Sequence, residues 1–278
     1  MPIKADCHIH SHHSGDSDAP MRAQIESALS AGLSALCFTE HYDPVFPYEN
    51  IPELAPGTFD LDLAAYRDEF LSLQEEYRGR IRLHFGVELG LQPHIARELE
   101  RWTAAAPDPE FIIGSVHVLD GRDPYYPEVF AGRTDQEVFR SYFEEVLACV
   151  KAFHSFQSMG HLDYIVRYGQ SGRDALYRPA DYLDVADEIL KILIEHGIAL
   201  EINTAPLSKG CRECNPASLI VRRYKELGGE RITVGSDAHA PGKIAQYFKT
   251  AEQMLLSCGF RYYCVFDHKE PSMLPLTE

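Results

Sequence analysis

The chain lacks a hydrophobic segment long enough to cross a membrane, although 45% of its 278 residues are hydrophobic. A transmembrane helix needs about 20 consecutive apolar residues, so we expect no membrane partner. Residues 1–6 also lack the charged and then apolar segments of a signal peptide. The hydrophobic content is ordinary for a globular protein. These absences together predict a globular protein without an export signal.

A paired cysteine framework is also lacking, because the seven cysteines are scattered and odd in number. Small secreted proteins held by disulfides carry even sets of cysteines, so this pattern predicts a reducing, cytoplasmic location. Cys211 and Cys214 have C-x-x-C spacing. Neither two further zinc ligands nor a thioredoxin-like context lies near them, and we interpret both as structural residues.

Positive charge is scarce, with 26 Lys and Arg against 42 Asp and Glu and a formal net charge of −16. Nucleic acids bind basic surfaces, so this balance disfavours a DNA or RNA partner. A small anionic substrate is compatible with it, because divalent ions would make a site locally positive. The sequence leaves the oligomeric state open.

Strand and helix patterns alternate along the chain, and we find no repeat, low-complexity tract or linker. Seven or eight strand–helix units predict an α/β barrel that forms one domain over residues 1–278. The two segments rich in proline or glycine, 43–58 and 120–132, predict loops near the site. The predicted strands are 33–38, 81–87, 111–116, 198–202, 232–234 and 262–266. The predicted helices are 21–31, 60–77, 93–106, 134–153, 179–195, 216–227 and 244–257.

Metal-binding side chains stand where successive apolar runs end. His8 and His10 are two residues apart, which puts both imidazoles on one face of an extended segment, where they can bind one ion. Asp237 and His239 repeat this spacing. Glu88 ends another apolar run, where a buried carboxylate needs a compensating charge. With His41, His117 and His161 at further strand ends, this pattern predicts a metal site at one mouth of the barrel.

Each of these residues also has a simpler interpretation. A single histidine near a strand end is usually a polar surface residue, and Glu88 could pair with an arginine of the barrel. Asp237 could cap the helix that follows Pro241. Six occurrences at successive strand ends of one chain favour the metal site over these separate explanations.

The ordered set of motifs resembles the polymerase and histidinol phosphatase (PHP) family over nearly the whole chain. The residues that carry the resemblance are His-x-His at 8–10, Thr-Glu-His at 39–41, Glu88, Ser-Val-His at 115–117, Gly-His at 160–161 and Ser-Asp-Ala-His at 236–239. Cys-Phe-Thr-Glu-His at 37–41 and Glu-Ile-Asn-Thr at 201–204 resemble its histidinol-phosphatase branch. The resemblance implies a distorted (β/α)7 TIM-like barrel with two to three divalent transition metals, zinc, manganese or iron.

The resemblance also implies how the ligands divide among three metal positions. Glu88 would bridge the first two positions, and some relatives have histidine where this chain has Asp16. An oxygen donor there favours manganese or iron over zinc. The implied ligands are His8, His10, Glu88 and Asp237 for the first ion, Glu88, His117 and His161 for the second, and Asp16, His41 and His239 for the third.

Such a centre predicts phosphomonoester hydrolysis. A hydroxide shared between two divalent ions is a nucleophile at neutral pH, because metal binding lowers the pKa of water. The catalytic residues that we predict are Glu88 and Asp237 at the metals, with Asp163 or His239 as the proton donor.

Phosphate also needs an anion clamp, and Arg167 is the first candidate because a guanidinium binds phosphate bidentately. Lys209 is a second candidate. For both residues the alternative is a solvated loop position. The resemblance places Ser115 and Asn203 close to the site, although hydrogen bonding at strand ends would explain them equally well.

The predicted function is hydrolysis of L-histidinol phosphate to L-histidinol and phosphate, a step of histidine biosynthesis. Two other activities are consistent with the family: hydrolysis of nucleoside phosphates or nucleic-acid ends, and phosphotyrosine phosphatase activity. The non-enzyme alternative is an inactive barrel with structural metals. The acidic composition weighs against nucleic acid, and the complete ligand set weighs against lost activity.

Overall fold

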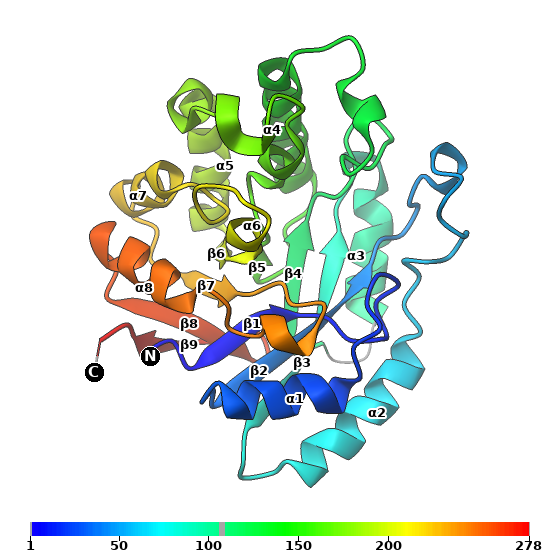
Figure 1. Ribbon diagram of the computed structural model, residues 1–278, viewed down its shortest axis with the longest axis vertical. Helices are drawn as coiled ribbons and strands as arrows, with labels where there is room; N and C mark the ends of the chain where they lie inside the picture. The colour runs from blue at the N-terminus through cyan, green and yellow to red at the C-terminus, as the bar shows by residue number, and fades with distance from the viewer. Residues whose placement is uncertain (1, 106–108, 278) are drawn as a thin grey trace.

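Seven parallel strands form a nearly closed barrel in the order β1 to β7 (Figure 1). The computed structural model describes residues 2–105 and 109–277, so the predicted helix end at Ala106 and both ends of the predicted domain lie outside the described residues. A bridge from Ile9 to Ala238 joins β1 to the residues after β7. The strands are β1 Ala5–Ile9, β2 Ala35–Tyr42, β3 Arg82–Gly90, β4 Phe111–Ser115, β5 Ser158–Met159, β6 Ala199–Asn203 and β7 Ile232–Gly235.

Helices surround the strands (Figure 1). Their ends follow capping chemistry: Thr134 and Glu137 form a capping box at the start of α4, and the Asp62 side chain caps α2. Helix α1 has no side-chain cap, since it begins directly after Pro20. The helices are α1 Met21–Ser30, α2 Leu63–Glu76, α3 Ala96–Ala105, α4 Asp135–Ala152, α5 Leu183–Glu195, α6 Ala205–Ser208, α7 Ser218–Glu226 and α8 Phe248–Ser257. Among the residues described, no helix combines the length and apolarity that a membrane crossing requires.

The alternation of side chains along β3 explains how an acidic residue reaches the interior. Leu83 and Phe85 belong to the hydrophobic cluster that contains Tyr66 and Phe70 of α2, outside the barrel. Because successive side chains of a strand point to opposite faces, Glu88 points to the inside. It is fully buried there.

The structure differs from the predicted strands in three places. Strand β5 was not predicted, because its two residues are too few to produce a hydrophobic pattern. The predicted last strand exists as β8, Tyr262–Asp267, but it pairs antiparallel with β9, Glu270–Pro275, instead of joining the barrel. Strand β9 was missed because its two prolines are typical of edge strands and turns.

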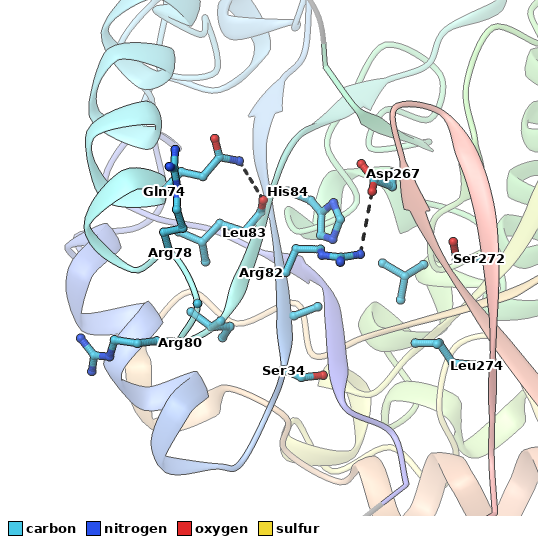
Figure 2. A pocket seen from close by; sticks show the side chains of 14 residues that line it. Ser34, Gln74, Arg78, Arg80, Arg82, Leu83, His84, Asp267, Ser272 and Leu274 are labelled. Carbon is cyan, nitrogen blue, oxygen red and sulfur yellow. Dashed lines mark hydrogen bonds and ion pairs between the residues drawn. The ribbon is translucent and has the colours of Figure 1, made fainter.

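The β8–β9 hairpin lies across the N-terminal mouth of the barrel. Phe266 stacks on Phe111 at the start of β4, with ring centroids 5.4 Å apart. The backbone N–H of Lys4, just before β1, donates to the Tyr263 hydroxyl over 2.9 Å. Figure 2 shows the cavity of about 610 Å³ between this hairpin and β3, where Arg82 points toward Asp267.

Candidate metal centre

The nine predicted metal ligands converge at the opposite, C-terminal mouth, with Glu88 in the middle. Glu88 Oε2 lies 3.1 Å from His8 Nε2 and 3.1 Å from His41 Nδ1. Glu88 Oε1 lies 2.9 Å from His161 Nε2 and 3.2 Å from His117 Nε2. One carboxylate therefore contacts four imidazoles that come from four different strand ends.

The other two carboxylates complete the cluster. Asp237 Oδ1 lies 3.5 Å from His10 Nε2. Asp16 Oδ2 lies 3.1 Å from His239 Nε2 and 3.6 Å from His41 Nε2. The structure thus brings Asp16 to the same pair of histidines that the resemblance implied.

Several polar atoms of this cluster are buried without a hydrogen-bond partner. Burying a polar group in this way costs about 1–3 kcal/mol. Within residues 2–105 and 109–277, five such atoms gather here: His8 Nε2, His10 Nε2, His41 Nδ1, Glu88 Oε2 and His161 Nδ1. The atoms of His8, His10 and His41 lie 3.1–3.5 Å from Glu88 Oε2, yet these contacts lack hydrogen-bond geometry. A divalent ion accepts lone pairs from nitrogen and oxygen donors in this arrangement, so the residues fit bound metals.

A second layer of residues orients the candidate ligands. Glu201 Oε1 lies 2.6 Å from His8 Nδ1, and Asp43 Oδ1 lies 2.9 Å from His117 Nδ1. Carboxylates behind metal-binding histidines fix the ring orientation and make the imidazole more basic. Sequence reasoning missed both roles, although Asp43 stands two residues after His41 and repeats the spacing of the other ligand pairs.

The charges in the cluster shift pKa values in opposite directions. Burial lowers the pKa of His41, but Asp16 and Glu88 outweigh it and raise the value to about 9. For His10, burial and the neighbouring His239 and His41 lower the pKa to about 3. The pKa of Glu88 is held well below its ordinary value despite burial, because the surrounding imidazoles favour its ionised form. Without metal, the cluster is thus a set of ionised carboxylates that hold protons on some of the histidines.

Arg167 is buried beside the cluster and is held on three sides. Its Nε donates to Asn215 Oδ1 over 2.8 Å, Nη1 to Asp237 Oδ2 over 3.1 Å and Nη2 to Asn203 Oδ1 over 2.9 Å. The guanidinium also lies over the Tyr164 ring at 4.8 Å. Arg167 is therefore fixed in orientation before any substrate arrives.

The other predicted site residues divide into two groups. Lys209 lines the cavity at this mouth, whereas Ser115 and Asn203 are fully buried behind it. The Ser115 hydroxyl donates to Glu88 Oε1 over 2.6 Å. Asp163 is also buried, where it accepts hydrogen bonds from Tyr177 Oη, Ala217 N and Asn215 Nδ2. Asp163 therefore supports Arg167 through Asn215 and does not face the cavity.

A cavity of about 560 Å³ opens over the cluster. Both predicted loops supply walls, including Phe46 from the first and Asp123 and Tyr125 from the second. Burial raises the pKa of Asp123 to about 6. Cys211 and Cys214 lie in another cavity and are buried free thiols, like the other five cysteines. In the cavity over the metal cluster, the aromatic wall is completed by Phe59, Tyr126, Tyr164 and Tyr168.

Comparison with known proteins gives consistent results. Residues 6–205 match the PHP domain family. A probable histidinol-phosphatase of Clostridium acetobutylicum is 32% identical over 92% of this chain and 94% of its own length. The histidinol-phosphatase of Lactococcus lactis is 32% identical over 95% and 94%, respectively. The crystal structure of the histidinol phosphate phosphatase from Lactococcus lactis, complexed with zinc, L-histidinol and phosphate, superposes with a TM-score of 0.86 at 30% identity and covers 97% of this chain and 99% of that one.

Proposed function

The chain belongs to the PHP domain family, and we propose that it is a metal-dependent phosphatase that hydrolyses L-histidinol phosphate to L-histidinol and phosphate. One observation carries this proposal: a buried cluster of unpartnered metal-binding atoms opens into a cavity in a barrel that matches a zinc-, histidinol- and phosphate-bound enzyme over nearly its whole length. Histidine biosynthesis follows as the pathway that this activity serves.

We further propose that the metals bind in three groups. Two of these groups share Glu88, whose two oxygens face different histidines. Divalent ions bound there would acidify water and neutralise charge on the phosphoryl group. The proposed groups are His8, His10, Glu88 and Asp237; Glu88, His117 and His161; and Asp16, His41 and His239.

Arg167 and Lys209 are the proposed phosphate-binding residues, because both line the cavity beside the cluster. The three hydrogen bonds of Arg167 keep its guanidinium in place, so little side-chain entropy is lost when phosphate binds. Burial and the neighbouring Arg167 lower the pKa of Lys209. Together these cations offset the dianionic charge of a phosphomonoester.

The rest of the substrate carries an amine and an imidazole, and the outer cavity has groups for both. The Asp123 carboxyl, with its pKa of about 6, is largely ionised at neutral pH and can pair with the amine. The aromatic wall gives the imidazole flat apolar surfaces. Of the two predicted proton donors for the leaving alcohol, only His239 lines this cavity.

The test is a profile of phosphate release over a panel of phosphomonoesters, with metal content measured on the same preparation. We expect the highest kcat/KM for L-histidinol phosphate among histidinol phosphate, nucleoside phosphates and phosphotyrosine. A far higher kcat/KM for nucleoside phosphates would replace the proposal with the nucleotide-directed alternative. Full metal content without activity on any ester would favour a barrel with structural metals. A cytoplasmic location and the lack of a nucleic-acid partner stay predictions.

A further inference from the structure

Three more metal-binding side chains lie together outside the centre just described, where the turn after β1 meets helix α2. We propose that His12, His13 and Glu69 bind one divalent transition-metal ion of the zinc type, separate from the ions at Glu88. This proposal does not depend on the identity of the substrate. It adds an outer metal site beside the buried one.

The three ligand atoms have the separations that one ion requires. Glu69 Oε2 lies 3.0 Å from His13 Nε2 and 3.3 Å from His12 Nε2, and all three atoms lie within 4.8 Å of one another. Donors bound about 2.0–2.1 Å from a tetrahedral zinc ion lie about 3.3 Å apart. The contact between His13 Nε2 and Glu69 Oε2 has hydrogen-bond geometry. His12 Nε2 lies close to the same oxygen without that geometry, like several histidine–carboxylate contacts of the buried cluster.

The turn that carries the two histidines is anchored at both ends, so the site is preorganised. The backbone N–H of Ser11 donates to the buried Glu40 carboxylate over 2.9 Å, and the Ser14 hydroxyl donates to the same group over 2.6 Å. The Ser14 oxygen also lies 3.0 Å from His10 Nδ1. The histidine pair is therefore held firmly against Glu69 on α2, and one serine connects it to the inner centre.

The exposure of the ligands distinguishes this site from the inner one. The side chains of His12 and Glu69 are 43% and 37% exposed, while His8 and Glu88 are fully buried. A set of two histidines and one carboxylate leaves a fourth zinc position for water. We therefore expect an ion here to exchange readily and to be the first that a chelator removes.

The experiment compares zinc content at equilibrium between wild-type protein and Glu69→Gln, both dialysed against zinc buffered at low concentration by a chelator. Glu69→Gln keeps the shape of the side chain but removes the shared ligand oxygen. We expect the variant to lose one zinc ion per chain and to keep the others. His12→Ala should lose the same ion, since it removes an exposed ligand that no core packing requires.

Two control variants test whether the loss is specific. Glu75→Gln removes another exposed carboxylate of α2, and His94→Ala removes another exposed imidazole. Both should keep the wild-type zinc content. Anomalous diffraction at the zinc edge should show a separate peak between His12, His13 and Glu69. Equal zinc content in wild type and Glu69→Gln, or no peak at these residues, would overturn the proposal whatever substrate the enzyme hydrolyses.

Discussion

The charged side chains at the two mouths of the barrel differ in burial and in pairing. At the N-terminal mouth, Arg82 lies 3.9 Å from Asp267, so opposite charges pair near solvent (Figure 2). Arg80, from the same cavity wall, lies 3.6 Å from Glu26. At the C-terminal mouth, buried histidines and carboxylates crowd together, with polar atoms left without hydrogen-bond partners. Buried polar groups without hydrogen bonds cost free energy, so a fold keeps such a cluster when a bound ligand offsets this cost. The comparison therefore separates the end of the barrel that supports the fold from the end that carries the chemistry.

The hairpin reinforces this division. By stacking Phe266 on Phe111, it covers the N-terminal mouth with apolar contacts. Among the side chains that the structure describes, one orphaned polar atom, His84 Nε2, lies at that end, against five in the metal cluster. If function is confined to the C-terminal mouth, substitutions there should change turnover, and substitutions at the N-terminal mouth should not.

The largest effect is expected for Glu88→Gln. The amide removes the charge that two metal groups would share, so turnover should fall by about three orders of magnitude or more. The measurement is kcat with metal content and circular dichroism of the same sample. Glu110→Gln, a carboxylate bonded to His84 near the other mouth, is the matched control and should keep wild-type turnover. Normal turnover of Glu88→Gln with intact metals would make Glu88 a scaffold residue.

Arg167→Ala should lower kcat/KM by a factor that corresponds to the loss of about 2–4 kcal/mol of transition-state stabilisation. The loss should extend to a small activated aryl phosphate, because the guanidinium acts on phosphate and not on the leaving group. Arg167→Lys keeps the charge but not the three hydrogen bonds, so we expect an intermediate value. An effect limited to histidinol phosphate would instead place Arg167 at the amine or imidazole.

Zinc binding to metal-free protein should release protons at pH 7 and fewer at pH 10. The pKa of His41 is about 9 and those of His8 and His117 are raised, so these groups hold protons at pH 7 that the metal must displace. Because the pKa of His41 is raised by folding, its protonation stabilises the metal-free fold fully below pH 6.5, the ordinary pKa of histidine. This contribution is lost as the pH rises through about 9. Calorimetry in buffers of different ionisation enthalpy measures the release. Equal release at both pH values would contradict these shifts.

The smallest effect is expected at the N-terminal mouth. Arg82 is 70% exposed and its partner Asp267 is 44% exposed, and such surface pairs contribute about 0–1 kcal/mol. Arg82→Ala should therefore change the free energy of unfolding by less than about 0.5 kcal/mol and leave kcat/KM unchanged. Chemical denaturation and steady-state kinetics provide both values. A large loss of activity would remove the functional distinction between the two mouths.

The metal-binding residues of this chain could be predicted from its sequence better than the strands that complete the barrel and cover its N-terminal mouth. Strand ends are visible because apolar residues of β2 and β3 precede His41 and Glu88 near the ends of these strands, and parallel strands bring such ends to one mouth. Strand β5 leaves no periodic pattern in two residues. The β8–β9 hairpin turns at His268 and Lys269, which both have positive φ but are not the Asn-Gly or Asp-Gly pair typical of such a turn. Glu201 and Asp43 were missed as ligand-orienting residues because only the folded structure shows which histidine each one faces.

The backbone at Asp237 is left-handed, with φ of 53°. This conformation restricts which residues at position 237 can preserve enzyme activity. Left-handed backbone costs most residues about 1–2 kcal/mol and is adopted readily by glycine, asparagine and aspartate alone. Glycine would relax the turn but lose the carboxylate, while glutamate or histidine would keep a ligand atom and strain the turn. Of the natural residues only aspartate meets both demands. A mutational scan for activity should therefore find this position among the least permissive of the chain, with asparagine and glycine the substitutions that best preserve the fold.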